Sequence, residues 1–575
     1  MELRPRALIA LAALVVAVLL LVVPAGARAA GLQFPSSQTQ PPTGYRLDAR
    51  QAIALAQTAV KIRDELRKHP GLRPYAYIER PRSWQVSWFD SKNHEKAQVL
   101  VDDPSGTVLE AWTGYQVAWR MARGYPGAFG RRFNAIYIWL PLGLLFLLPF
   151  VDPRRPFRLL HLDMLMLVAF AVSHFFFERG NIGVSVPLVY PVLGYLLVRM
   201  LVAGFRPRRR SGRLVPFAPV WALGLAVLFL TGFRIGLNLT DSNVIDVGYS
   251  GVIGADHITH GQGLYNGNFP ADDAHGDTYG PVNYLAYVPF EQVFPWHGTW
   301  DSLPGAHAAA VAFDLLTLLG LFLLGRRLRA GPQGTTLGVT LAFAWAAYPY
   351  SMFALSTNAN DSLIAALVVF ALVALTSPPG RGVLLALAAA AKFAPLTLAP
   401  LLARGRGALR SRGTAIAALA MVAVLLAAFL PFVPQGGLHA LWHRTLGSQV
   451  NRSSPFSVWG QTSLGWLHVL WEGLSVALAL AVALVPRRRS AIQVAALAAA
   501  VLVAFQIGAQ HWFYLYIMWF APLVFVALFA QYEDVTATAA PARSSVPARR
   551  PLPRPPRRSA TDPLLRFRTS PASSS

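Results

Sequence analysis

The sequence predicts a polytopic α-helical membrane protein with about twelve transmembrane helices, a re-entrant hairpin and a small α+β domain near the N-terminus. Hydrophobic residues make up 54% of the chain and charged residues only 14%, which is not the balance of a soluble globular protein. Apolar runs of about 17–25 residues, the length needed to cross a bilayer, recur along the chain. We expect spans near 7–25, 133–151, 159–177, 183–203, 215–237, 305–324, 334–353, 362–376, 412–432, 462–485, 491–508 and 513–530.

The formal net charge of +24 is explained by topology. Lys and Arg gather at the ends of apolar runs, as in Arg208 to Arg210 and Arg487 to Arg489, and this pattern marks cytoplasmic loops. We therefore expect a multi-pass protein of the cell membrane and no nucleic-acid partner. The chain has no Cys, which excludes disulfides and thiol catalysis. Its Ala- and Arg-rich composition is typical of a GC-rich bacterial genome.

Four segments follow from this pattern. Residues 1–29 have a basic start, an apolar run and a small-residue cleavage site, which fits a signal peptide or a signal anchor equally well. Residues 30–132 form an extracytoplasmic domain, and 133–530 form the multi-span region. Residues 531–575, rich in Pro, Arg and Ser, are expected to be a disordered cytoplasmic tail.

The extracytoplasmic domain is predicted to place a helix before a sheet. Ala49 to Leu66 has helical periodicity, while Trp84, Val86 and Trp88 alternate with Gln85 and Ser87, as on a half-buried strand. Residues 102–106 form a turn sequence between two further strands. The W-x-V-x-W and V-D-D-P-S-G-T-V-L elements in this order resemble a PepSY-like domain, which implies an accessory role.

One apolar segment, 382–403, does not fit a simple crossing. Basic residues flank both of its ends, so a full crossing would invert the topology of every later span. Pro395 and Pro400 interrupt the helix inside it. We therefore predict a re-entrant hairpin that returns to the cytoplasmic side, packed against protein.

The loop 238–304 is the most unusual part of the chain. It contains no Lys or Arg, carries eight carboxylates, and by the charge rule faces outward. It is too long to be a simple connection. Two of its carboxylates, Asp241 and Asp246, closely follow a span and are candidates for a general base. Spacing alone does not rank them, and both fit solvated loop acids as well.

Several motifs occur in a defined order along the membrane region. They are Asp246-Val-Gly-Tyr249, Gly261-Gln-Gly-Leu-Tyr265, Thr278-Tyr279-Gly280-Pro281, Asn358-Ala-Asn360-Asp361, Lys392-Phe-Ala-Pro395 and Arg452-Ser-Ser-Pro-Phe-Ser-Val-Trp459. This set, within about 215–530, resembles the polyprenol-phosphate-sugar-dependent glycosyltransferases of the GT-C fold class, in particular family 87. Tyr249 comes one position earlier than in the family pattern, and Gly280 stands where the family has a Pro.

The resemblance implies an inverting hexosyltransferase at the outer membrane face. The donor would be a sugar, by analogy mannose, on a polyprenyl phosphate, and the acceptor a cell-envelope glycolipid or glycan. The resemblance favours Asp246 as the base, with Asp241 second. It also places Tyr279, Asn360 and Asp361 among the substrate-binding residues.

A lipid-phosphate leaving group needs cations near the outer leaflet, because Arg binds phosphate oxygens and offsets their charge. Arg234, Arg444 and Arg452 are the candidates, and headgroup snorkelling is the alternative for each. Lys392 is the only one of five lysines outside the N-terminal domain, and an ionisable group at membrane depth is usually functional. His511, in a short outer turn, either lines the sugar site or belongs to the interfacial aromatic belt.

We expect no cofactor. His257, His260 and the acidic run 272–277 have ligand types suited to a divalent cation, but their spacing matches no recognised site. No Walker-type phosphate loop occurs, so direct use of a nucleoside triphosphate is not expected. The alternative function is a transporter or flippase of envelope lipids or polysaccharide, which would use the buried charges as a pathway. The absence of internal repeats and the acidic outer loop favour the enzyme.

Overall fold

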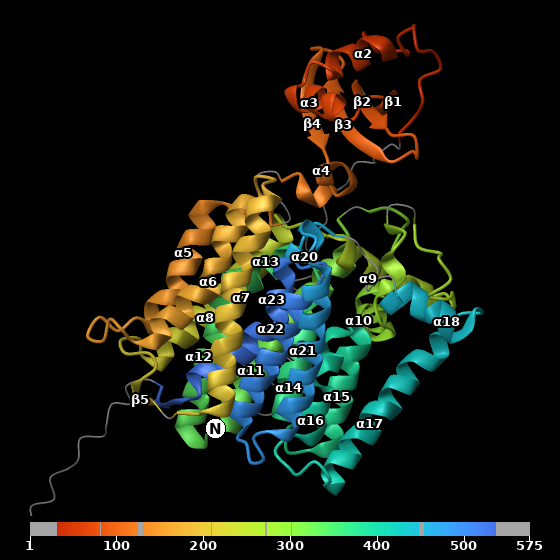
Figure 1. The fold of residues 1–575 in the computed structure, drawn as a ribbon. Helices are drawn as coiled ribbons and strands as arrows, with labels where there is room; N and C mark the ends of the chain where they lie inside the picture. The colour runs from red at the N-terminus through yellow and green to blue at the C-terminus, as the bar shows by residue number, and fades with distance from the viewer. Residues whose placement is uncertain are drawn as a thin grey trace, which may run out of the picture. The chain divides into compact units, whose positions relative to one another are not determined.

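The computed structural model describes residues 32–80, 82–124, 130–208, 210–270, 273–300, 302–447 and 454–535. The predicted signal segment, residues 536–575 of the predicted tail and Arg452 lie outside these residues, whereas residues 532–534 of the predicted tail form a short strand. Figure 1 shows the order of the elements, a small α/β region followed by a large helical region.

The N-terminal region contains two helices and a four-stranded antiparallel sheet in the order β1-β2-β3-β4. Its elements are α2 (Ala49–Ala56), α3 (Val60–Lys68), β1 (Arg73–Arg80), β2 (Ser83–Phe89), β3 (Glu95–Asp102) and β4 (Thr107–Thr113). The single helix expected over 49–66 is thus two helices, with α2 capped at its start by Asp48. The turn between β3 and β4 lies where the sequence predicts it, and Gly106 adopts the positive φ of +68° that such a turn favours.

Strand β2 is buried on both faces, which differs from the half-buried strand that its sequence predicts. Trp84, Val86 and Trp88 belong to the core of this region, as expected. Gln85 and Ser87 on the other face are buried as well, and the Gln85 amide donates to the Ser87 hydroxyl at 3.1 Å. The segment after β4 accounts for burial on this side, because α4 (Tyr115–Ala118) packs against β3 and β4.

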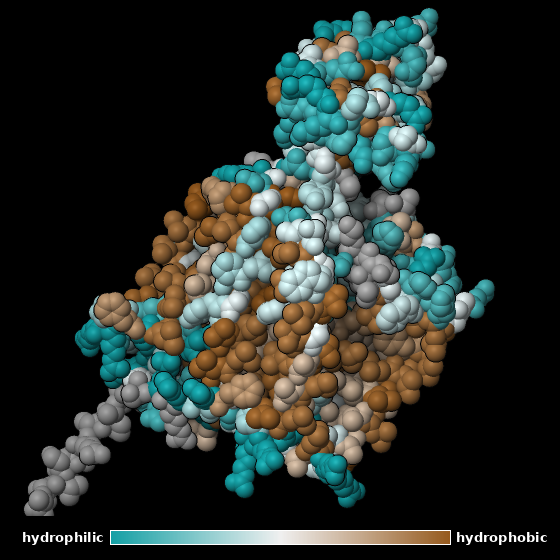
Figure 2. Space-filling model, in the orientation of Figure 1, coloured by the Kyte–Doolittle hydropathy of each residue, from teal (hydrophilic) through white to brown (hydrophobic). Residues whose placement is uncertain are grey.

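Seven helices among the described residues are long and apolar enough to cross a membrane. They are α6 (Leu159–Phe177), α7 (Ile182–Phe205), α8 (Val220–Thr240), α11 (Pro304–Leu328), α17 (Arg412–Phe429, continued by η7, Leu430–Phe432), α21 (Gly465–Leu484) and α22 (Ala491–Gly508). Figure 2 shows apolar side chains covering much of the visible surface of these helices, as a bilayer requires.

The other predicted spans among the described residues form shorter helices, and the predicted span 7–25 lies outside those residues, so the expected count of about twelve is not confirmed. Residues 136–150, 361–373 and 514–529 form apolar helices below the usual spanning length. The predicted span 334–353 is divided at Tyr348 into α12 and α13, because Pro349 cannot continue the preceding helix. The helices concerned are α5 (Ile136–Leu147, then η3, Leu148–Phe150), α12 (Gly331–Ala347), α13 (Pro349–Ser356), α14 (Asp361–Val373) and α23 (Ile517–Phe529, after η9, Tyr514–Tyr516).

The segment 382–403 forms a helical hairpin, as its flanking charges predict. Helix α15 (Pro378–Ala391) ends at Lys392, and the chain returns through η6 (Ala394–Leu398) and α16 (Ala399–Arg404). The Arg381 side chain, near the start of α15, donates to the carbonyls of Leu402 at 2.9 Å and Ala403 at 3.0 Å. The two ends of the segment therefore meet at one end of the helical region.

The acidic loop is folded. It contains α9 (Asp246–Thr259), η5 (Gly276–Thr278) and α10 (Pro281–Glu291). Helices α9 and α10 pack closely because Gly251 and Gly254 leave room for two tyrosine rings of α10; a Cβ on either glycine would lie within 2.6 Å of those rings. The remaining short elements are η1 (Arg120–Ala122), η2 (Arg131–Asn134), β5 (Arg210–Arg213), α18 (Gly437–Trp442), η8 (His443–Gly447), α20 (Val458–Gln461) and β6 (Tyr532–Asp534).

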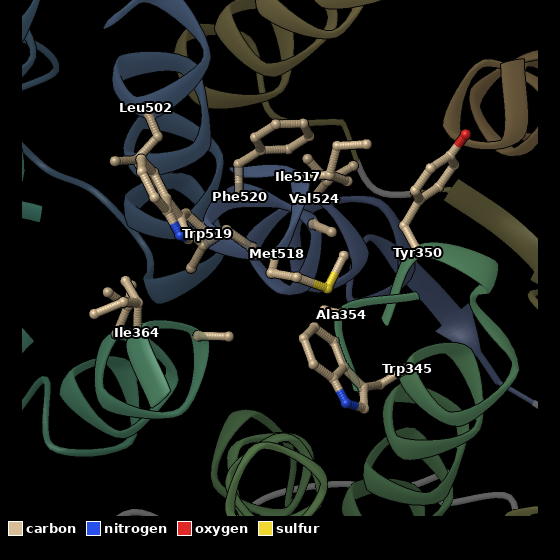
Figure 3. Packing of buried hydrophobic residues seen from close by; sticks show 14 of the residues in the cluster. Trp345, Tyr350, Ala354, Ile364, Leu502, Ile517, Met518, Trp519, Phe520 and Val524 are labelled. Atoms are coloured by element: carbon tan, nitrogen blue, oxygen red, sulfur yellow. The ribbon is translucent and has the colours of Figure 1, made fainter. Parts of the chain in front are cut away.

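Helix α23 lies in the apolar core of the helical region. Figure 3 shows Trp519 of α23 between Leu502 of α22 and Ile364 of α14. Met518, on the same helix, points toward Trp345 of α12. All five side chains are buried. Helix α14 packs against both α23 and α15, which brings polar residues from these helices together.

Candidate active site

A buried ion pair joins the hairpin to the start of α14. The Lys392 Nζ lies 2.7 Å from Asp361 Oδ1, and Trp519 Nε1 donates to the same oxygen at 2.7 Å. Asp361 is fully buried and Lys392 is 8% exposed. Lys392 occupies the break between α15 and η6, where its extended backbone ends the helix. The helix break thus places an ammonium group inside the protein, next to a carboxylate that holds it.

Three aromatic rings surround this ammonium group. The Nζ of Lys392 lies 5.7 Å from the ring centroid of Tyr279, 6.0 Å from that of Tyr516 and 5.4 Å from that of Trp519. Rings at this distance attract a cation through their negative faces. Tyr279 comes from the acidic loop, whereas Tyr516 and Trp519 come from the C-terminal end of the helical region, so two distant segments supply the three rings.

Gly280 brings the loop to the hairpin. Its amide donates to the carbonyl of Ala391 at 3.3 Å, and a Cβ at this position would lie 2.0 Å from the carbonyl oxygen of Ala390. Only glycine permits this close approach of two backbones. The departure from the family pattern at this position therefore has a local packing reason.

Hydrogen bonds also join the start of the loop to the turn before α14. The amides of Asn243 and Ile245 donate to the carbonyls of Ser356 at 2.9 Å and Thr357 at 3.2 Å. The Asn358 side chain donates to the Asn243 carbonyl at 2.9 Å. These bonds place the first turn of α9 beside the first turn of α14.

Asp246 is the first residue of α9 and its side chain is exposed. The positive end of the helix dipole favours a carboxylate there, and Oδ1 accepts from the Val247 amide at 2.9 Å. One turn later, the Ser250 hydroxyl donates to Asp273 Oδ2 at 2.6 Å. Burial and then the charge of Asp246 raise the pKa of Tyr279 well above its usual value, with Asp273 and Asp361 adding to the effect. Tyr279 therefore has carboxylates of both the loop and α14 around it, and its hydroxyl stays protonated.

Asn360 and Asp361 both face this interior. The Asn360 amide donates to the side chain of Asn283, and both residues are fully buried. Within the part of the chain that the structure describes, Asn360 Oδ1, Asn283 Nδ2 and Asp361 Oδ2 are buried without a hydrogen-bond partner. Such groups are costly to bury in a purely structural role, because each forfeits its bonds to water.

Two other predicted residues lie in neighbouring clusters of loop residues. Arg444 binds Asp277 at 3.0 Å, and its guanidinium lies over Gly267. Burial raises the pKa of Asp277, and the Arg444 charge partly offsets this effect. His511 contacts the Ser454 hydroxyl at 2.9 Å and packs against the rings of Trp119 and Phe456. Trp119 belongs to the segment that follows the N-terminal sheet, so this segment contacts the residues around Phe456 and His511.

The structure places Asp241 and Arg234 away from this cluster. Asp241 caps the end of α8 and binds Arg132 Nε at 2.6 Å. Arg234 is 1% exposed and forms an ion pair with Asp314, while its Nη1 donates to the carbonyl of Ala346 at 3.0 Å. Its guanidinium points into the helix bundle, not toward the lipid headgroups. We therefore leave Arg234 out of the proposed site.

Several of the residues considered for a divalent cation contact other side chains instead. No group of three or more His, Cys, Asp or Glu suited to a metal ion occurs among the described residues. His260 contacts Asp256 at 3.1 Å, whereas burial lowers the pKa of His257, which packs against the ring of Phe269. Asp277 pairs with Arg444, and Asp272 lies outside the described residues.

The model of glycosyltransferase family 87 matches residues 278–509. This part of the membrane region is therefore similar to the glycosyltransferases of family 87. No curated protein matches the chain. The matched segment contains Tyr279, Asn360, Asp361, Lys392 and Arg444. Asp246 precedes it and His511 follows it.

Sequence reasoning missed several residues of this candidate site. Tyr516 and Trp519 lie in a run that reads only as an apolar span. Asn283 carries no charge, and Asp273 stood in a group considered only for metal binding. Three polar atoms of this site are buried without a hydrogen-bond partner among the described residues, and only the three-dimensional structure reveals this.

Proposed function

We propose that this glycosyltransferase moves a sugar, mannose by the family resemblance, from a polyprenyl phosphate to a hydroxyl of a cell-envelope glycolipid or glycan at the outer membrane face. One observation carries the proposal: the buried ammonium of Lys392 lies 5.7 Å from the ring centroid of Tyr279, and the exposed carboxylate of Asp246 is near enough to help raise the pKa of the same tyrosine. A base and a cation near one tyrosine are the two charges that inverting transfer from a phosphate requires.

The proposed reaction is a single displacement. The Asp246 carboxylate takes the proton of the acceptor hydroxyl, and the acceptor oxygen attacks the anomeric carbon of the donor sugar. The bond between that carbon and the phosphate oxygen breaks, and the lipid phosphate leaves with the bonding electrons. The exposure of Asp246 suits the base, because the acceptor must reach it from outside the membrane.

The leaving phosphate gains negative charge as this bond breaks. Lys392 is the cation that lies beside the Tyr279 ring of the proposed site, and its burial strengthens its attraction for that charge. The protonated hydroxyl of Tyr279 is suited to donate a hydrogen bond to the donor. Asp361 and Trp519 act as positioning residues, because they hold Lys392 through one shared carboxylate oxygen.

Substituting Asp246 by Asn tests the proposal. Asp246→Asn keeps the side-chain volume and removes the base, so transfer should fall by about 10²- to 10⁴-fold while the thermal unfolding midpoint stays unchanged. The measurement is sugar transfer by the purified full-length protein from polyprenyl-phosphate mannose to a lipid acceptor. Asp241→Asn is the matched control, since Asp241 lies five positions earlier and binds Arg132. It should keep most activity.

Two outcomes would contradict the assignment. Loss of transfer in Asp241→Asn but not in Asp246→Asn would move the base to Asp241. Retention of transfer in both variants would exclude a base on this loop. If neither the natural chain nor any variant transfers sugar from this donor, although all unfold cooperatively, the donor assignment is wrong.

A further inference from the structure

A second charged site lies at the far end of the hairpin. Arg381 and Lys392 are eleven positions apart on α15, which separates them by about 16 Å along the helix axis. Around Arg381 is an open cavity of about 530 Å³. Figure 1 places α16 near one end of the helices, whereas α9 lies near the other. The cavity is lined by Leu375, Thr376, Pro378, Arg381, Arg406, Gly407, Ser411, Gly413, Arg488 and Arg489.

The charge around this cavity has one sign. Four of its ten lining residues are arginines and none is acidic. The sequence contains no Asp or Glu between Asp361 and Glu472, nor between Glu472 and Glu533, so the segments that form the cavity supply no counter-charge. Uncompensated cations this close together repel one another and attract an anion.

The buried arginines bind only backbone oxygens in the contacts that the structure shows. Arg381 donates to the carbonyls of Leu402 and Gly413, and Arg489 donates to those of Val482 and Ala483. Both side chains are about 95% buried, with 5% exposed. The Nε of Arg489 is buried and has no hydrogen-bond partner among the described residues. Burial and then the charge of Arg404 lower the pKa of Arg489 to about 10.

The N-termini of three helices add to the positive electrostatic potential around this cavity. Helices α15, α17 and α22 begin after Ser377, Ser411 and Ser490, which cap them. Ser411 lines the cavity, as does Pro378 in the first turn of α15. The positive ends of the helix dipoles therefore reinforce the arginine charges at this end of the helices.

We propose that this cavity binds the phosphate of an anionic phospholipid headgroup. Its surroundings favour a lipid over a free anion, because exposed apolar side chains adjoin the arginines. Leu409, Leu484 and Val485 are 45%, 52% and 53% exposed, and they stand within four positions of Arg406 or Arg488. Acyl chains lie along such side chains while the phosphate occupies the cavity. Basic residues between helices at the cytoplasmic end, to which the charge rule assigns these arginines, are suited to this role.

Headgroup binding has a consequence for the hairpin. Arg381 connects the start of α15 to the end of α16 and to the start of α17. An anion in the cavity neutralises the repulsion among the arginines that hold these three helices together. The bound lipid thus stabilises the hairpin that carries Lys392 at its other end.

The test uses two matched double variants of the full-length protein. Arg406→Gln/Arg488→Gln removes two exposed arginines that line the cavity. Arg410→Gln/Arg487→Gln removes two exposed arginines from the same segments that do not line it. Phosphatidylglycerol is titrated into each protein in a phosphatidylcholine environment. The rise of the thermal unfolding midpoint is measured at each lipid concentration, and native mass spectrometry counts the bound lipid separately.

We expect the lipid concentration for half-maximal stabilisation to rise about 30-fold in the cavity variant. Each arginine contributes about 1 kcal/mol, and 1.4 kcal/mol corresponds to tenfold. The control variant should stay within about threefold of the natural chain. Equal weakening in both variants would overturn the site and leave general surface attraction. Stabilisation by inorganic phosphate alone that blocks the lipid effect would overturn the lipid as occupant.

Discussion

Two buried ion pairs of the membrane region have a similar arrangement but differ in how fully their polar atoms are hydrogen-bonded. Arg234 pairs with Asp314 and Lys392 pairs with Asp361, and in each pair a tryptophan Nε1 donates to Oδ1 of the aspartate, at 2.8 Å and 2.7 Å. The Arg234 pair joins α8 to α11, whereas the Lys392 pair joins α14 to the end of α15. What distinguishes them is how many of their polar atoms the protein satisfies.

The Arg234 pair is saturated. Its guanidinium contacts both oxygens of Asp314, the carbonyl of Ala346 and the hydroxyl of Ser351 at 2.9 Å. At the Lys392 pair, by contrast, Asp361 Oδ2 has no partner among the described residues, and aromatic rings surround the ammonium. A buried pair with all of its polar atoms bonded fixes helices, whereas a buried pair with an unbonded oxygen beside the acidic loop is suited to bind a ligand.

The largest stability effect is expected at the saturated pair. Arg234→Met leaves the Asp314 carboxylate buried and uncompensated, so the free energy of unfolding should fall by about 3–5 kcal/mol. The measurement is unfolding of the purified protein by heat or denaturant. Adding Asp314→Asn removes the stranded charge and should restore most of the loss. If Arg234→Met unfolds like the natural chain, this pair is not the structural one.

A smaller effect, on activity, is expected from Tyr279. Tyr279→Phe removes a protonated hydroxyl and keeps the ring beside Lys392, so transfer should fall about tenfold with little change in stability. Tyr350→Phe is the matched control, because its buried hydroxyl has no hydrogen-bond partner among the described residues and lies in α13. Equal activity in the two variants would exclude the Tyr279 hydroxyl from the proposed site and leave the ring beside Lys392 as the functional part of this side chain.

The sequence predicted those features whose charge is unusual for their position. The acidic loop and the hairpin with its single lysine break the charge pattern of the chain, and the structure brings both together around Tyr279. Arg234 was misplaced because its partner Asp314 lies 80 positions away, and a sequence does not reveal whether a guanidinium faces lipid or another helix. Trp519 was missed because an aromatic residue in an apolar run carries no signal of its hydrogen bond.

Helix lengths were predicted less well than helix positions. Hydropathy locates an apolar segment but does not reveal where a proline divides it, as Pro349 divides α12 from α13. It also does not separate a buried helix from one that crosses the bilayer, because both are apolar on every side. The short helix α14 is such a case, and its first residue, Asp361, belongs to the site.

The central claim is that the unsaturated pair serves the reaction and the saturated pair serves the fold. The most direct test compares transfer by two charge-neutral double variants, Lys392→Met/Asp361→Asn and Arg234→Met/Asp314→Asn. Neither leaves an unpaired buried charge, so both should fold. We predict that the first loses transfer by about 10²- to 10³-fold and that the second retains it within about threefold. Equal retention in both, or loss only in the second, would contradict the claim.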